Sequence, residues 1–240
     1  MSQERTEALV LRAVDFSNTS RIVTFLTPDR GRLACLATGA RRPKSPLNVL
    51  LDTFNRLELV YYWKDGRAVQ KLAEASLLEA FSGIKADLEK TMFGAFGLEL
   101  AGKVAHENEP SERLFATLVH GLHGLNAWEG DIRHHAAWQS MQLLIEAGFE
   151  PALTHCAECG KELAIAKGFK FLGGAVCANC PADRPISPET HAALRALSES
   201  RDTCPPARAA RETFGLLREF AAHQLETSFR SLRVIDQVFA

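Results

Sequence analysis

Several kinds of sequence feature are missing from this chain of 240 residues, and each absence argues against a class of protein. No run approaches the roughly 20 unbroken apolar residues that a membrane helix requires. The polar first residues lead into no signal-peptide core, so we expect a cytoplasmic protein without a membrane partner. Phosphate-binding-loop, H-E-x-x-H, G-x-S-x-G and G-x-G-x-x-G motifs are also lacking. An enzyme is therefore the least favoured interpretation.

Net charge is nearly absent too, because 28 Lys and Arg oppose 29 Asp and Glu. The balance hides an uneven distribution. Residues 1–80 hold 12 basic and 9 acidic side chains, residues 81–150 hold 5 and 10, and residues 151–240 hold 11 and 10. Most of the basic excess at the front lies between Asp29 and Lys44. This pattern predicts separate surfaces for separate partners.

Strand-like segments dominate the first 80 residues. Branched and apolar residues recur at strand length, with turn signals at Pro28-Asp29-Arg30-Gly31 and Lys64-Asp65-Gly66-Arg67. The expected strands are 6–14, 21–27, 32–38, 53–63 and 67–75. Five short strands fit a small closed barrel, and the OB-fold is the commonest five-stranded one. An SH3-like barrel would look similar.

The pattern becomes helical after Phe81. One helix is expected over 84–106, apolar on both faces and hence buried, with Ile84, Leu88, Ala95 and Leu98 on one of them. Further helices are expected to begin after Ser111, near Asp131, at Ser187-Pro188 and at Pro206, the last reaching about Glu226. The predicted class is α+β and multidomain. Its parts are a barrel (1–80), a helical domain in two pieces (81–152 and 184–240) and a cysteine-rich insert (153–183).

Two C-x2-C pairs with 17 residues between them form the strongest chemical signal. They consist of Cys156, Cys159, Cys177 and Cys180. Each pair can direct two thiolates at one ion, and two pairs complete the tetrahedron that Zn²⁺ prefers. Since four thiolates leave no position for water or substrate, the predicted zinc is structural.

Other assignments of these cysteines are possible. Two disulfides are disfavoured in the cytoplasm, and four free thiols are the second alternative. His155 could replace one thiolate as a ligand. Cys35 and Cys204 lie far from the cluster in sequence, and we expect a core strand residue and a loop thiol.

A basic segment, Gly39 to Ser45, is the second signal. It carries Arg41, Arg42 and Lys44, is stiffened by Pro43, and follows Arg30 and Arg32. Such a segment suits phosphate contacts without sequence selectivity, although a solvated basic loop has the same composition. Aromatic residues that could stack on bases are Phe54, Tyr61, Tyr62 and Trp63, some of which must fill the barrel core.

Residues spread over nearly the whole chain match one family in order and spacing. They are Leu9 to Arg12, Ser20 to Thr24, Gly39 to Ser45, Leu72 to Ala75, the cysteine pairs and Arg230 to Arg233. In these the chain resembles the bacterial recombination mediator RecO. It departs from the family at Ala8, where glycine is usual, and the cysteines are not universal in the family.

The resemblance implies an OB-fold, a helical domain with a zinc module, and a function in recombinational DNA repair. It implies binding of single- and double-stranded DNA and annealing of complementary strands in the bacterial nucleoid. The implied protein partners are the C-terminal tail of the single-strand-binding protein and RecR, with which the family helps to load RecA.

Two sets of site residues follow as hypotheses. The phosphate-binding set is Arg21, Arg32, Arg41, Arg42 and Lys44. A second set, Arg208, Arg211 and Arg218, lies on the last expected helix beside Phe214, Leu217 and Ala221, and could bind a short acidic and apolar peptide. An ordinary amphipathic helix looks the same. A protein adaptor whose DNA contact is incidental remains the alternative function, and salt dependence separates the two.

Overall fold

The computed structural model describes residues 2–206 and 208–239. The chain forms two compact units. The first holds the residues up to 86 together with 101–123, and the second holds 87–100 together with those from 124 onward. The sequence-based boundaries at residues 80, 152 and 183 stay predictions.

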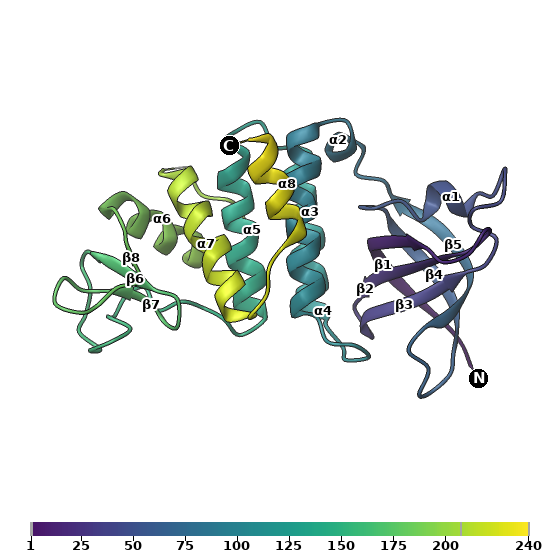
Figure 1. Cartoon of the computed structure of the whole chain (residues 1–240), viewed down its shortest axis with the longest axis horizontal. Helices are drawn as coiled ribbons and strands as arrows, with labels where there is room; N and C mark the ends of the chain where they lie inside the picture. The colour runs from purple at the N-terminus through teal and green to yellow at the C-terminus, as the bar shows by residue number, and fades with distance from the viewer. Residues whose placement is uncertain (1, 207, 240) are drawn as a thin grey trace. The chain divides into compact units, whose positions relative to one another are not determined.

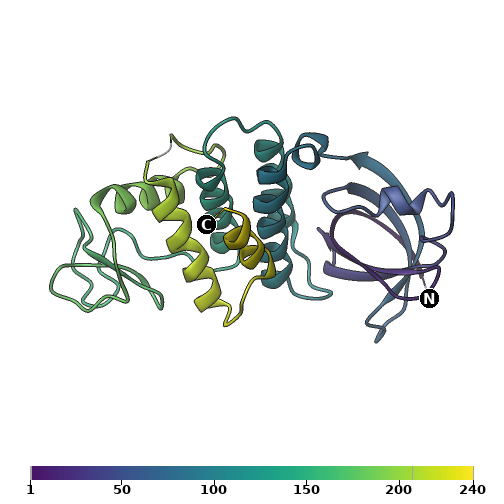
Figure 2. The same cartoon turned by 45° about the horizontal axis from the view of Figure 1, so that its top comes forward.

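Five strands close into a barrel in the first unit, with the order β1-β2-β3-β5-β4 (Figures 1 and 2). They are β1 (Ser2–Asp15), β2 (Arg21–Thr27), β3 (Gly31–Ala37), β4 (Arg56–Trp63) and β5 (Gln70–Glu79). Neighbours are antiparallel except β3 and β5, which pair in parallel at Cys35–Gln70 and Leu36–Lys71. The short helix α1 (Leu47–Leu50) lies between β3 and β4 in sequence. This is the expected OB-fold, and all five expected strands are present.

Alternation along the strands fills the barrel. Inward positions hold branched and aromatic residues with some small ones, and Val23, Cys35 and Leu59 are fully buried. Tyr61, 1% exposed, also belongs to this interior. The Tyr61 hydroxyl donates to Glu4 at 2.9 Å, which satisfies its polar end.

The helices of the chain are α2 (Ser82–Lys85), α3 (Leu88–Val104), α4 (Glu112–Asn126), α5 (Ile132–Glu146), α6 (Pro188–Glu199), α7 (Ala210–Gln224) and α8 (Arg230–Val238). The starts predicted near Asp131 and at Ser187 are confirmed, since both side chains accept hydrogen bonds from the helix backbone that follows.

Two helix predictions were wrong. The single helix expected over 84–106 is divided into α2 and α3, because Asp87 accepts from the Lys90 backbone N–H at 3.0 Å and starts a new helix. Leu88, expected inside, is 65% exposed at that start. The last expected helix begins at Ala210 instead of Pro206, and a further helix, α8, follows it.

The core of the second unit is aromatic. Phe96 makes edge-to-face contacts with Phe214 of α7 and Phe229, at centroid distances of 5.7 and 5.1 Å. The helix α5 packs against α6 and α7 and is buried along nearly its whole length. Two of its polar side chains are bonded to the end of α6, since the Trp138 indole N–H donates to the Ser200 carbonyl at 2.8 Å and the Gln142 amide donates to the Leu197 carbonyl at 2.7 Å. Among the described residues, no helix has the length and apolar character needed to span a bilayer.

Candidate functional site

The four cysteines of the two C-x2-C pairs come together in the second unit. The sulfur atoms of Cys156, Cys159, Cys177 and Cys180 all lie within 4.8 Å of one another. Cys159 Sγ and Cys177 Sγ are 3.9 Å apart. A tetrahedral zinc with Zn–S bonds of about 2.3 Å requires sulfur–sulfur separations of about 3.8 Å. The cluster therefore has the dimensions of a four-thiolate metal site.

Hydrogen bonds shift the pKa values of two of these thiols in opposite directions. Backbone N–H groups of Cys159 and Cys177 lower the pKa of Cys156 to about 6, and the second of these lies 3.4 Å from the sulfur. Contacts with the Cys177 and Cys159 sulfurs raise the pKa of Cys180 to about 12. Four thiolates this close repel one another, so a divalent cation at their centre would be needed for all of them to ionise.

Tight backbone turns hold each pair in place. The Gly160 N–H donates to the Cys156 carbonyl at 2.9 Å, and Gly160 has a φ of +72°. Before the second pair, Gly174 has a φ of +135°, and a Cβ there would collide with the backbone of Ala152. The glycines in the local sequence thus allow the turn that each cysteine pair requires.

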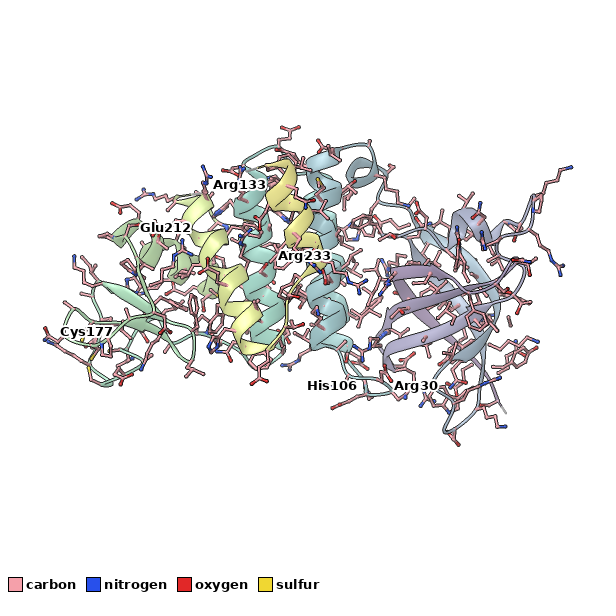
Figure 3. All side chains as sticks on the ribbon, in the orientation of Figure 1. Arg30, His106, Arg133, Cys177, Glu212 and Arg233 are labelled. Atoms are coloured by element: carbon pink, nitrogen blue, oxygen red, sulfur yellow. The ribbon has the colours of Figure 1, made fainter. Side chains whose placement is uncertain are left out.

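We call residues 153–183, which contain both cysteine pairs, the cysteine module, and a small three-stranded sheet connects the pairs to the helices. Its strands are β6 (Gly168–Lys170), β7 (Gly174–Val176) and β8 (Arg184–Pro185), and Figure 3 marks Cys177 beside them. Phe169 meets Phe220 of α7 edge-to-face at 5.5 Å. The Gln224 side chain donates to the Phe171 carbonyl at 2.7 Å. The cysteine module is therefore anchored on α7.

The remaining cysteines and His155 lie outside the cluster. The His155 ring is exposed and forms a 3.0 Å hydrogen bond with the Thr154 hydroxyl. Cys35 is a buried strand residue and Cys204 a loop thiol, as expected. Burial raises the pKa of both to about 12, so neither is a reactive thiolate.

Part of the predicted phosphate-binding set gathers at one end of the barrel. Arg21 and Arg41 both pair with Asp15, at 3.0 and 3.2 Å. Arg41 also donates to the Ser17 carbonyl at 2.7 Å. These bonds fix the beginning of the basic segment against the β1–β2 loop.

Two cations of the segment extend further into solvent. Arg42 and Lys44 are exposed, and within residues 2–206 and 208–239 no carboxylate pairs with either. Arg32 lies elsewhere, because it faces Leu26 at the opposite end of β3. It donates to the Gly102 carbonyl at 2.9 Å and pairs with Glu107 at 3.0 Å. The structure thus brings four of the five residues to one end and leaves Arg32 apart.

The aromatic residues considered for base stacking are mostly engaged. Phe54 and Tyr61 are both buried, at 3% and 1% exposed. The Arg30 guanidinium lies 4.2 Å from the centre of the Trp63 ring, and Lys71 lies 5.9 Å from that of Tyr62. The sequence did not indicate Phe16, an aromatic ring that is 62% exposed in the β1–β2 loop.

A cavity of about 480 Å³ lies in the second unit, between α3, α5, α7 and α8. Residues that line it include Phe93, Arg133, Arg211, Phe214, Arg218 and Ile235. Figure 3 marks Arg133 and Glu212 on the helices beside it. Arg218 forms a bidentate pair with Asp236, whereas no ion pair among the described residues involves Arg211.

The peptide-binding hypothesis needs correction in its details. Arg208 lies in the loop before α7 and is not among the described lining residues. Leu217 and Ala221 are fully buried in the core, so they offer no open apolar face. The apolar residues that line the cavity beside Arg211 include Phe93, Phe214 and Ile235, which are themselves at most 4% exposed.

Two family models match the chain almost from end to end. One describes the N-terminal part of recombination protein O and matches residues 1–81. The other describes the C-terminal part of the same protein and matches residues 85–233. The chain belongs to the RecO family.

Individual RecO relatives are similar to the chain over nearly their full length. DNA repair protein RecO of Salinibacter ruber is 33% identical, over 98% of this chain and 94% of the relative. That of Anaeromyxobacter dehalogenans is 32% identical, over 99% and 98%. A Nocardioides RecO is 34% identical, over 97% and 99%. The RecO name denotes a DNA repair protein and no enzyme class.

We predict that Cys159→Ser reduces bound zinc well below the stoichiometry of about one ion per chain that four thiolates give, because a serine hydroxyl is a poor zinc ligand. Zinc content after purification, measured by mass spectrometry, checks this. Cys204→Ser is the matched control, since it removes a thiol outside the cluster and should keep the zinc. Equal zinc in both variants, or none in the wild type, would contradict the assignment.

Proposed function

We propose that this chain is a non-enzymatic recombination mediator whose barrel binds DNA through its phosphates. The observation that carries the proposal is the basic end of the barrel, where Arg41 is fixed on the β1–β2 loop and Arg42 and Lys44 project without acidic partners. Arg21 adds a fourth cation there. Unpaired surface cations in a cluster are the electrostatic requirement for sequence-independent binding.

Annealing of complementary strands follows from the same chemistry. Cations that hold one strand by its phosphates reduce repulsion of a second strand and leave bases free to pair. Single- and double-stranded DNA would both bind, since each presents phosphates. We infer that the chain acts in the bacterial cytoplasm on nucleoid DNA and, with RecR, helps to load RecA.

The cysteine module would hold structural zinc in this function. All four ligand positions are protein sulfurs, which leaves none for a substrate. Phe169 and Gln224 join the module to α7, the helix that also lines the cavity. Zinc would therefore support the shape of the cavity without any chemistry of its own.

The cavity in the second unit suits the C-terminal tail of single-strand-binding protein, which we propose as its ligand. Phe93, Phe214 and Ile235 would receive an apolar side chain. Arg211 and Arg133 would face the acidic groups and the terminal carboxylate. A mediator needs such a contact in order to reach DNA that single-strand-binding protein already covers.

The DNA-binding proposal predicts a measurable salt effect. The triple variant Arg41→Glu/Arg42→Glu/Lys44→Glu should bind a labelled single strand much more weakly. Its slope of log K against log salt should fall by about 2, since each phosphate contact on a single strand contributes about 0.7. Fluorescence anisotropy at several salt concentrations measures both.

A control with the same charge change separates local from global effects. Lys161→Glu/Lys167→Glu/Arg201→Glu alters exposed cations of the second unit and should bind DNA nearly as the wild type does. Equal losses in the two triple variants would argue against the basic end of the barrel. No wild-type binding even at low salt would favour the adaptor function instead.

The peptide proposal predicts that Arg211→Glu weakens binding of a tail peptide about tenfold or more, the loss expected for a charge-assisted hydrogen bond. Isothermal titration with the isolated peptide measures this. Arg208→Glu makes the same change outside the cavity and should have a much smaller effect. Undiminished binding by Arg211→Glu would remove the cavity from the account.

A further inference from the structure

One band of the barrel's outer surface is apolar where a solvated sheet would be polar. Strand pairing joins Val14 to Ile22, Ile22 to Leu36, Leu36 to Lys71 and Lys71 to Tyr62. The immediate neighbours Val23 and Cys35 point inward and are fully buried, so Ile22 and Leu36 face outward. Apolar side chains in a row on an outer face mark a surface that binds something.

A groove of about 410 Å³ lies over this row. Its apolar and basic lining residues are Phe16, Ile22, Leu36, Arg67, Val69 and Lys71, and no carboxylate is among the described lining residues. Ile22, Leu36 and Val69 form an apolar floor. Phe16 supplies an aromatic ring at one edge, and the other edge carries two cations, Arg67 and Lys71.

The loop that carries Phe16 is held in a defined conformation. The Phe16 N–H donates to the Ser20 carbonyl at 3.0 Å, and the Ser20 N–H donates to the Ser17 hydroxyl oxygen at 3.2 Å. The same loop binds the basic segment, because the Arg41 N–H donates to the Thr19 carbonyl at 3.0 Å. The groove and the basic segment are therefore joined through one short turn.

An apolar floor with an aromatic edge and cations, and without acidic groups, matches an unpaired nucleotide. A base presents a flat apolar face that stacks on an aromatic ring, and its phosphate requires a cation. A duplex cannot use the groove in this way, because its bases are already stacked on each other. An acidic peptide could pair with the two cations, but its carboxylates would not stack on the exposed Phe16 ring.

We propose that the groove is a stacking site for one unpaired base of single-stranded DNA, with Phe16 as the stacking residue and Arg67 and Lys71 on the adjoining phosphates. The inference rests on the DNA-binding function proposed above and adds a preference for single strands over duplexes. The strand would continue over the β1–β2 loop to Arg42 and Lys44.

The test compares strands with and without bases. Wild type, Phe16→Leu and Leu78→Ala are titrated with an oligo-dT strand, with a strand of the same length containing abasic positions, and with a duplex, at one salt concentration. Phe16→Leu should lose about tenfold in affinity for oligo-dT, the contribution of one base–aromatic stack. Its affinity for the abasic strand and for the duplex should be unchanged. Phe16→Trp, which keeps an aromatic ring at this position, should show the wild-type preference for oligo-dT.

Leu78→Ala is the control, since Leu78 is a 49% exposed apolar residue of the same barrel that lies outside the groove. It should behave as the wild type. If Phe16→Leu keeps the wild-type preference for oligo-dT, or weakens all three ligands equally, the groove binds no base and the inference fails while phosphate binding stands. If the wild type binds no DNA, the proposed function fails with it.

Discussion

The closure of the barrel by one long strand is the constraint on which the basic end of the barrel depends. Strand β1 pairs with β4 along Ser2–Leu9 and with β2 along Leu9–Asp15, and its register shifts between Val10 and Arg12. A strand that serves two neighbours must bend, and the irregularity provides the bend. Closure brings the β1–β2 loop, the end of β3 and the β4–β5 loop together around one groove, which residues of all three line. The basic segment and the groove exist because those three connections meet there.

Other interactions than strand closure hold the second unit together. Its helices share an aromatic core, whereas the cysteine module has short strands and little interior of its own. A metal ion held by the four clustered sulfurs would compensate for that, since metal binding contributes folding free energy directly. Helix α7 connects the two arrangements, because Phe220 anchors the module and Arg211, Phe214 and Arg218 line the cavity. Loss of zinc would thus affect the cavity through this helix.

Local signals in the sequence were sufficient for part of this description. The cysteine pairs can be identified because ligands with two residues between them need only a tight turn, and the strands can be predicted because burial along a strand has a period of two. Features set by distant pairing were missed. Arg30 covers Trp63 only once the barrel has closed, and Arg32 is separated from Arg41 by the length of β3. The groove required the register of three strands, so Phe16 carried no signal in the sequence.

Hydrogen exchange of the backbone with and without a saturating single strand tests the central claim most directly, namely that one end of the barrel binds DNA. The account predicts slower exchange in residues 16–22, 39–45 and 64–71, and no change in residues 153–183. Protection confined to the second unit, with the three barrel segments unaffected, would contradict it.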